Sequence, residues 1–159
     1  MAYRQTRNQE ASIIDSLKVN FAADWSNINV EMSFARVYEI SLPTVCVRLG
    51  NISHSSVEIG TDSTKRSSQL LIDVFASNDG QLRDLVDYTV EKIKAGFVYY
   101  DYVITSGVVD SKTANGRISV KKPIEITYIN FDDNKNNLDT HDRYRSLISA
   151  EISIGKAEA

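Results

Sequence analysis

Acidic and amide side chains near the C-terminal end of the chain have a spacing that could bind calcium. Asp132, Asn134 and Asn136 stand at i, i+2 and i+4, as the first three ligands of a calcium loop do. Asn137 takes the sixth position, where asparagine can adopt the left-handed backbone that glycine usually supplies. Arg143 takes the twelfth position, which needs a bidentate glutamate. Because that ligand is missing, we expect a solvated turn.

The histidines and the cysteine do not form a recognisable catalytic or metal set. His54, His141 and the single cysteine, Cys46, are too few for a standard zinc site. The chain has no Gly-x-Ser-x-Gly elbow and no glycine-rich phosphate loop, and Cys46 stands in a strand pattern beside no candidate base. We therefore expect no catalytic residue, no cofactor and no metal, and the chain is not predicted to be an enzyme.

Two strand carboxylates remain as candidates for acid–base chemistry. Asp73 and Asp101 could pair with one another, but a salt bridge to an arginine such as Arg143 or Arg145 is the commoner arrangement. A deep pocket that held Asp73, Asp101 or His54 together would favour a small cytosolic enzyme with a cryptic site. That enzyme is the most distant of the functions that we consider.

The dipeptide Asn115-Gly116 is the strongest hairpin signal in the chain, because both central residues of a type I′ turn need positive φ. We predict a two-residue turn there, inside a long hairpin over residues 102–129. In that register Asp110 would face Lys121 as an opposite-charge pair across the strands. The arms exceed the usual ~5–6 residues of a strand, so the hairpin is expected to project from the body.

The predicted hairpin is also basic. Its basic side chains are Lys112, Arg117, Lys121 and Lys122, and between residues 110 and 122 they are offset only by Asp110. Such an arm could dock on an acidic protein surface or on DNA phosphates. Lysines on an exposed strand also block aggregation, so a solubilising tip is the alternative. Because the charges are few, protein is favoured over DNA as the partner.

Length and composition indicate one globular domain. The chain has 159 residues, of which 42% are hydrophobic, and we expect one domain over residues 1–154 with a flexible tail over 155–159. The net charge of −3 disfavours broad nucleic-acid or membrane binding. No apolar run approaches the ~20 residues that span a bilayer, and the N-terminus has no secretory signal. Folding in a reducing cytoplasm is therefore expected.

Hydrophobic periodicity predicts an α+β fold, a mostly antiparallel sheet packed by two helices with the long projecting hairpin. Helical spacing predicts a helix over 5–21, and a second helix between Asn78, which can cap it, and Gly96, which can end it. Alternating apolar residues predict strands at 28–32, 44–49, 68–76, 97–102 and 142–154, with a short edge strand at 57–60. Strand 68–76 should be central, and alternation in 97–102 directs Tyr100 and Tyr102 inward.

The order of these elements resembles the tail terminator, or tail-completion, proteins of long-tailed bacteriophages. The likeness lies in Val57-Glu58-Ile59-Gly60, in Arg66 leading into Leu71-Ile72-Asp73-Val74-Phe75-Ala76, and in the helix that begins near Gly80. Asp142-Arg143-Tyr144-Arg145 before the last strand also resembles phage tail and connector proteins. The likeness is one of pattern over residues 5–154 and includes no signature motif.

The resemblance implies a structural role in the virion. Such proteins form a ring, usually hexameric, on the end of the tail tube, where they stop tube growth and offer a face for head joining. The implied partners are further copies of the chain, the tail tube protein and a head-completion or connector protein, with DNA at most passing through the ring. The implied location is the tail end or neck of a virion assembled in the host cytoplasm.

The resemblance and the basic hairpin together define candidate assembly residues. These are Glu58, Arg66, Lys112, Asn115, Gly116, Arg117, Lys121, Lys122, Arg143 and Arg145. The nearest alternative function is another neck, head-completion or minor tail protein, which would bind the capsid side first.

Overall fold

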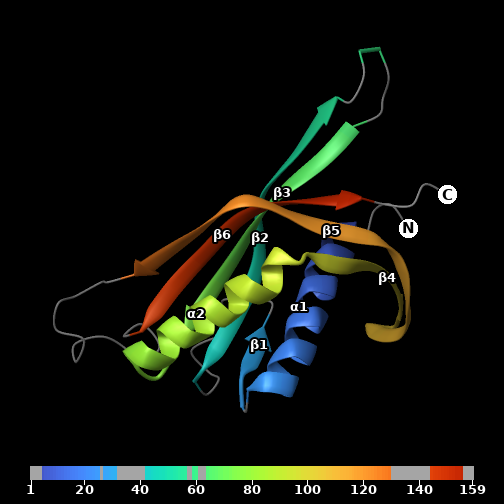
Figure 1. Cartoon of the computed structure of the whole chain (residues 1–159). Helices are drawn as coiled ribbons and strands as arrows, with labels where there is room; N and C mark the ends of the chain where they lie inside the picture. The colour runs from blue at the N-terminus through green and yellow to red at the C-terminus, as the bar shows by residue number, and fades with distance from the viewer. Residues whose placement is uncertain are drawn as a thin grey trace.

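A six-stranded sheet carries the part of the chain that the computed structural model describes (Figure 1). That part comprises residues 5–25, 27–31, 42–56, 59–60, 64–129 and 144–155. Its elements, in chain order, are α1 (Gln5–Asp24), β1 (Asn29–Glu31), β2 (Thr44–Ser56), β3 (Thr64–Phe75), α2 (Asp79–Lys94), β4 (Phe97–Thr105), β5 (Val108–Ile129) and β6 (Arg145–Gly155). The predicted α+β class and the mostly antiparallel sheet are confirmed.

Several predicted features lie outside the described residues. They are Glu58, the calcium-like loop at 132–139, His141, Arg143 and the tail beyond Gly155.

The last strand of the chain lies in the middle of the sheet. The strand order is β1-β2-β3-β6-β5-β4, and each neighbouring pair is antiparallel except β1 with β2. β3 lies between β2 and β6, so the strand predicted to be central is central. Because β6 joins β3 to β5, the sheet is complete only when residues far apart in the sequence have met, which is typical of slowly folding topologies.

The sequence around α2 explains both of its ends. The side chain of Asn78 accepts a hydrogen bond from the backbone N–H of Gln81 at 2.8 Å, and Gln81 Oε1 accepts one from the N–H of Ser77 at 2.8 Å. These bonds satisfy amides that a helix start leaves free. The apolar stripe faces β3, β5 and β6 and is buried: Leu82, Leu85, Val86, Thr89 and Ile93. Both the cap and the stripe were predicted.

Gly96 turns the chain from α2 into β4, as predicted. Its φ is +74°, and a Cβ at this position would lie 2.5 Å from the carbonyl oxygen of Ile118. Only glycine accepts both the left-handed backbone and this close approach. The tight turn sets β4 directly beside β5.

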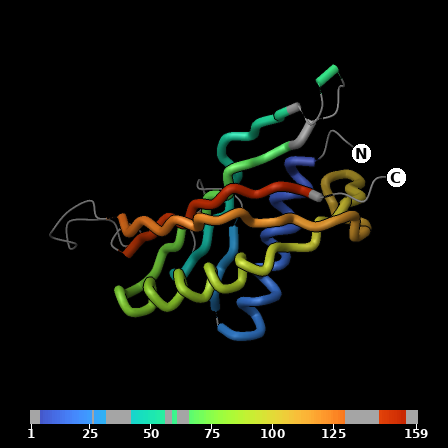
Figure 2. Tube along the Cα trace, turned by 45° about the horizontal axis from the view of Figure 1, so that its top comes forward, coloured from blue at the N-terminus to red at the C-terminus, as the bar shows by residue number. Residues whose placement is uncertain are grey.

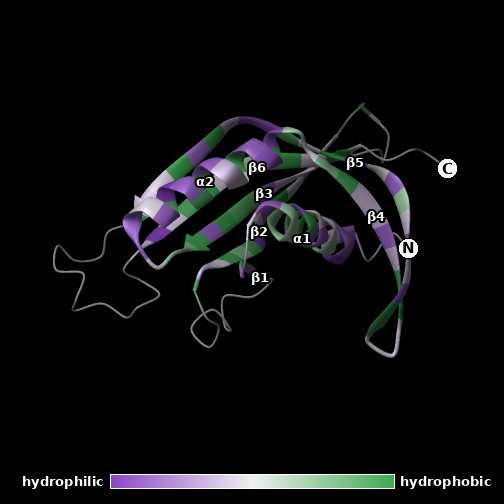
Figure 3. Ribbon diagram, turned by 60° about the horizontal axis from the view of Figure 1, so that its bottom comes forward, coloured by the Kyte–Doolittle hydropathy of each residue, from purple (hydrophilic) through white to green (hydrophobic). Residues whose placement is uncertain are grey.

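The helix α1 lies between the two margins of the curled sheet. Figure 3 shows β4 on one side of α1 and β1 and β2 on the other. Its buried apolar face consists of Ile13, Ile14, Leu17 and Phe21. Ser12 Oγ accepts a hydrogen bond from the N–H of Tyr100 in β4 at 3.0 Å, and Glu10 Oε1 accepts one from the N–H of Leu49 in β2 at 3.4 Å. The helix thus bonds to backbone amides of the edge strand β4 and of β2, the latter beyond the residues that pair with β1.

The predicted turn at Asn115-Gly116 is wrong. The hairpin turns at Ser106 and Gly107, which have φ values of +50° and +81°, and β5 runs unbroken through Asn115. Lys121 faces Glu151 of β6 instead of Asp110. The turn between β4 and β5 therefore lies nearer the N-terminus than predicted, at Ser106-Gly107, a dipeptide that also accepts two positive φ angles.

Asn115 and Gly116 form a β-bulge. Between the pairs Val98↔Arg117 and Tyr100↔Ala114, these two residues of β5 stand opposite Tyr99 alone. Gly116 has a φ of +118°, which glycine adopts without strain. The same residue type that favours a type I′ turn also favours a bulge, which explains the wrong prediction.

Tyr100 and Tyr102 lie on the same face of β4, as the predicted alternation requires, with their ring centroids 6.3 Å apart. Tyr102 is buried, with 7% of its surface exposed, whereas Tyr100 is half-buried. Tyr99 lies on the opposite face of the strand with Asp101, where Asn8 contacts both, and it is also buried. Both faces of β4 are therefore covered at this point.

Two two-stranded arms leave the sheet where β6 ends (Figure 2). β3 pairs with β6 from Ser67 onward, so Thr64–Arg66 pair with β2 alone. β5 pairs with β6 from Arg117 onward, so Val108–Gly116 pair with β4 alone, across the bulge. Each arm therefore has strand edges without a neighbouring strand in the described part of the chain.

Removing buried side chains should test this core. Ile72→Ala and Leu85→Ala remove fully buried side chains, and each should lower the free energy of unfolding by about 2–5 kcal/mol through lost burial and a cavity. Urea denaturation measures the loss. Lys18→Ala, at an exposed position on α1, is the control and should change stability by less than about 0.5 kcal/mol. A loss below about 1 kcal/mol for both buried sites would contradict the assigned core.

Candidate functional site

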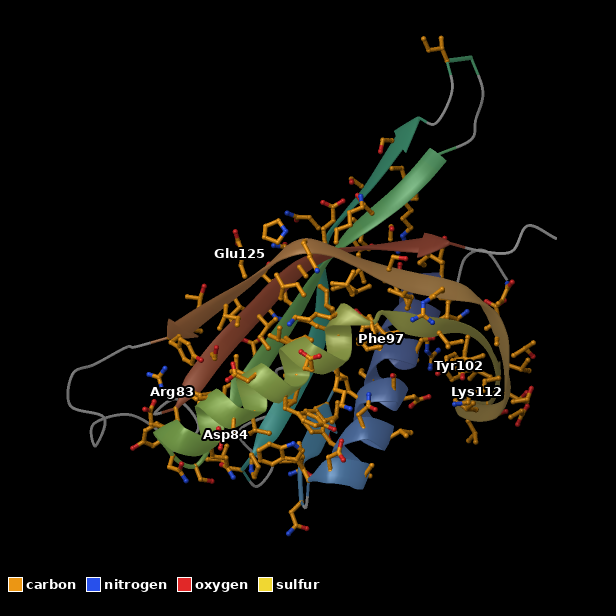
Figure 4. All side chains as sticks on the ribbon, viewed as in Figure 1. Arg83, Asp84, Phe97, Tyr102, Lys112 and Glu125 are labelled. Atoms are coloured by element: carbon orange, nitrogen blue, oxygen red, sulfur yellow. The ribbon has the colours of Figure 1, made fainter. Side chains whose placement is uncertain are left out.

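The predicted basic tip is not formed. Its six residues all lie on β5: Lys112, Asn115, Gly116, Arg117, Lys121 and Lys122. Lys121 pairs with Glu151 of β6 at 3.0 Å, and Arg117 donates to the carbonyl of Ala95 at the end of α2. Lys112 lies farther along the strand, on the arm beside α1 (Figure 4). The basic side chains therefore lie at separate places along β5 and do not form one basic surface.

The other described candidates, Arg66 and Arg145, make contacts within the chain. Arg66 donates to Thr6 Oγ1 at the start of α1. Arg145 lies 3.3 Å from one carboxylate oxygen of Asp73, and Arg48 lies 3.2 Å from the other. Asp73 is only 1% exposed, so two guanidinium groups hold a buried carboxylate. The predicted arginine salt bridge of Asp73 is confirmed.

Asp101 belongs to a different polar cluster. Asn115 Nδ2 donates to one of its oxygens at 2.6 Å, and Asn8 Nδ2 donates to the other at 3.3 Å. Asn8 is 1% exposed and also lies 3.4 Å from the hydroxyl of Tyr99. Because β6 and β5 separate β3 from β4, Asp101 does not meet Asp73. Asn115 in the bulge of β5 is thus hydrogen-bonded to Asp101 of β4, which is in turn hydrogen-bonded to Asn8 of α1.

The sheet face opposite the helices holds a polar trough of about 550 Å³. Gln69 donates to Ser149 at 3.3 Å across its floor, and the hydroxyls of Ser53 and Ser67 lie 2.8 Å apart. Two acids, Glu125 and Glu151, lie in its wall. A trough with hydroxyls and carboxylates but no unpaired cation in its described lining does not favour phosphate binding.

Hydrogen bonds join α1 to the base of the β4–β5 arm. Ser12 accepts from the N–H of Tyr100, and the hydroxyl of Tyr102 donates to Asp15 Oδ2 at 2.6 Å. Tyr102 and Lys112, which pair across the two strands, both lie on this arm (Figure 4). The helix and the arm therefore meet along a line of polar contacts.

Beside these contacts is a hollow of about 200 Å³, which we name the seam hollow. Its apolar wall is formed by Val19 of α1, which is 70% exposed, and by Val98 of β4, which is 38% exposed. Tyr100 also lines it, with the ammonium of Lys112 4.5 Å from the centre of its ring. Asp15, Ser16 and Asn20 complete the rim. The seam hollow is partly apolar and has one cation at its edge.

The end of the arm is apolar, which the sequence analysis missed. Val103 and Val108 flank the turn and are 52% and 65% exposed; we name them the tip cluster. They share one face of the arm, because Val108 pairs with Thr105, two residues from Val103, whereas Val109 pairs with Ile104 on the other face. Asp110 follows Val109 and is exposed. Two exposed aliphatic side chains on one face beside a tight turn indicate a contact surface. The signal was Val-Ile-Thr-Ser-Gly-Val-Val at 103–109, in which Ser-Gly separates two apolar pairs.

The described residues offer no assembled site for metal or nucleophilic chemistry. They contain no group of three or more His, Cys, Asp or Glu placed to hold a metal ion. Cys46 is fully buried, and burial together with the nearby Asp73 carboxylate raises the pKa of its thiol to about 11. A thiol with this pKa supplies little thiolate at neutral pH. Neither described helix is long and apolar enough to cross a membrane.

The bond between Asn115 and Asp101 should stabilise the fold. Asn115→Ala removes a donor from a partly buried carboxylate and should lower the free energy of unfolding by about 1–3 kcal/mol. Asn115→Asp should cost more at pH 7, because two carboxylates then face each other. Urea denaturation measures both, with Asn51→Ala at an exposed position as control. An Asn115→Ala variant as stable as wild type would refute the bond's contribution.

Tyr102 should make stability fall at alkaline pH. Burial, and next its hydrogen bond to Asp15, raise the pKa of its hydroxyl. Its contribution is therefore complete below the unfolded pKa of ~10 and is lost as the pH rises above it, because the unfolded chain ionises first. Tyr102→Phe should flatten the loss of stability between pH 9 and 11 in urea titrations. An unchanged slope would show that this hydroxyl is not responsible.

Neither the known protein families nor the curated proteins contain a match to this chain.

Proposed function

We propose that the chain is a structural protein of a tailed phage that acts as a tail terminator. In this role, copies form a ring on the end of the tail tube, stop its polymerisation and provide a surface for head joining. The arrangement of an N-terminal helix, an antiparallel sheet and a second helix on that sheet agrees with the architecture that the resemblance implies. The proposed partners are other copies, the tail tube protein and a head-completion or connector protein.

The observation that carries the proposal is the pair of arms that extend past the end of β6. Strand edges without a neighbour can add to the sheet of another chain. The tip cluster adds exposed aliphatic side chains to one arm, where a solitary protein would favour polar ones. Both features favour a protein whose surface is completed by assembly.

The chemistry of the described residues agrees with a role that needs no catalysis. The carboxylates that could have formed a cryptic site lie on separate strands, and Asp73 is held between Arg48 and Arg145. His54 lies on the β2–β3 arm opposite Arg66, away from both carboxylates. The argument for an enzyme therefore gains no support from this arrangement.

Adding the purified protein to tail tubes assembled without a terminator tests the proposal. Negative-stain electron microscopy should then show extra ring density at one tube end, and the tube length should stop increasing. A matched control is bovine serum albumin at the same concentration, which should leave the tubes growing. If this protein leaves the ends bare and the tubes still lengthen, the terminator role is wrong and another neck component becomes the better proposal.

A further inference from the structure

The seam hollow and the tip cluster are two unlike surfaces of one chain, each with exposed apolar side chains. The tip cluster presents Val103 and Val108 on one face of the arm, both more than half exposed. The seam hollow presents Val19 and Val98 around a concave volume of about 200 Å³. The hollow is several times larger than the ~30 Å³ that one water molecule occupies in the liquid, so an aliphatic side chain can enter it.

The charges beside these two surfaces are complementary. Asp110 lies two residues after Val108 of the tip cluster, is exposed and makes no ion pair in the described part of the chain. Lys112 lies at the rim of the seam hollow, where its ammonium contacts the ring of Tyr100 and no described carboxylate within salt-bridge distance. The other acid at the rim, Asp15, already accepts from Tyr102. The cation at the hollow is thus available to an incoming acid.

The chain cannot join these two surfaces within itself. Val98 lies at the base of the arm, and Thr105, which pairs with Val108, lies seven residues farther along the same strand. At ~3.3 Å per residue, the base and the tip are separated by about 23 Å. Because β4 and β5 stay paired over this length, the tip cannot fold back onto its own base. The tip cluster that enters a given seam hollow must therefore belong to another molecule.

We propose that the tip cluster of one copy fills the seam hollow of a second copy, with Asp110 of the first pairing with Lys112 of the second. The contact joins unlike surfaces, so its repetition produces a closed ring when the rotation between copies closes, and an open filament when it does not. This inference rests on the proposed function and adds the residues through which neighbouring copies would meet. The apolar contact supplies burial, and the ion pair sets the register.

Engineered disulfides test the contact directly. Val19→Cys and Val108→Cys are purified separately, mixed and mildly oxidised, and the disulfide-linked dimer is followed on non-reducing gels. The mixture should link at least ten times faster than either variant alone. The native Cys46 gives a clean background, because it is fully buried and its thiol has a raised pKa. Linkage of the mixture no faster than that of each single variant would overturn the contact.

Charge reversal supplies the second test. Asp110→Lys and Lys112→Asp should each weaken self-association several-fold in sedimentation experiments, and the double variant should restore it, because it recreates the pair in the opposite sense. Lys122→Asp, also exposed on β5, is the control and should have no effect. Val108→Asp, which would place a charge in the hollow, should weaken association more than tenfold. Circular dichroism confirms that each variant is folded.

Native mass spectrometry of the same samples separates the two proposals. Oligomers that form although the Val19→Cys and Val108→Cys variants do not cross-link would overturn this contact but not the terminator role. Linked oligomers that leave tail tubes growing would support the contact and overturn the terminator role. A protein that neither associates at high concentration nor binds tube ends would overturn both.

Discussion

The structure depends on how a curled sheet satisfies backbone amides that no neighbouring strand reaches. A sheet that does not close leaves such amides free, and they are costly when they are buried without partners. Helix α1 supplies acceptors to two of them: Ser12 accepts from Tyr100 of the edge strand β4, and Glu10 accepts from Leu49 of β2, beyond the residues that pair with β1. Its apolar face fills the space between these two strands, so one helix completes both the core and the hydrogen bonding.

The long strand β5 depends on its bulge in a similar way. It pairs with β4 before the bulge at Asn115 and Gly116 and with β6 after it. The extra residue bends the strand, so that the β4–β5 arm turns away from the β6 side of the sheet. Asn115 then reaches Asp101, which also binds Asn8 of α1. The arm is therefore anchored at its base by polar contacts and is apolar at its end.

This combination of a rigid base and an apolar tip suits a component that is completed by its neighbours. A mobile loop would lose conformational entropy on docking, whereas a two-stranded arm has already lost most of it. The seam hollow exists only because α1 packs against the edge of β4, so the internal hydrogen bonds also shape the external surface. The contacts that stabilise the fold therefore also shape the surface on which the proposed assembly depends.

Local patterns in the sequence were sufficient to predict the class of the fold, the capped helix α2 and the central β3. These features follow from periodicity and from residues such as Asn78 and Gly96, whose conformations are restricted by their own side chains or lack of one. The place of the hairpin was not predictable in this way, because Asn-Gly and Ser-Gly both accept positive φ, and the pairing partners of β5 decide which becomes the turn. The seam hollow and the tip cluster likewise come from segments far apart in the chain. Only the tertiary structure brings α1 against β4 and leaves the valines at 103, 108 and 109 without cover, because burial depends on which distant strands meet.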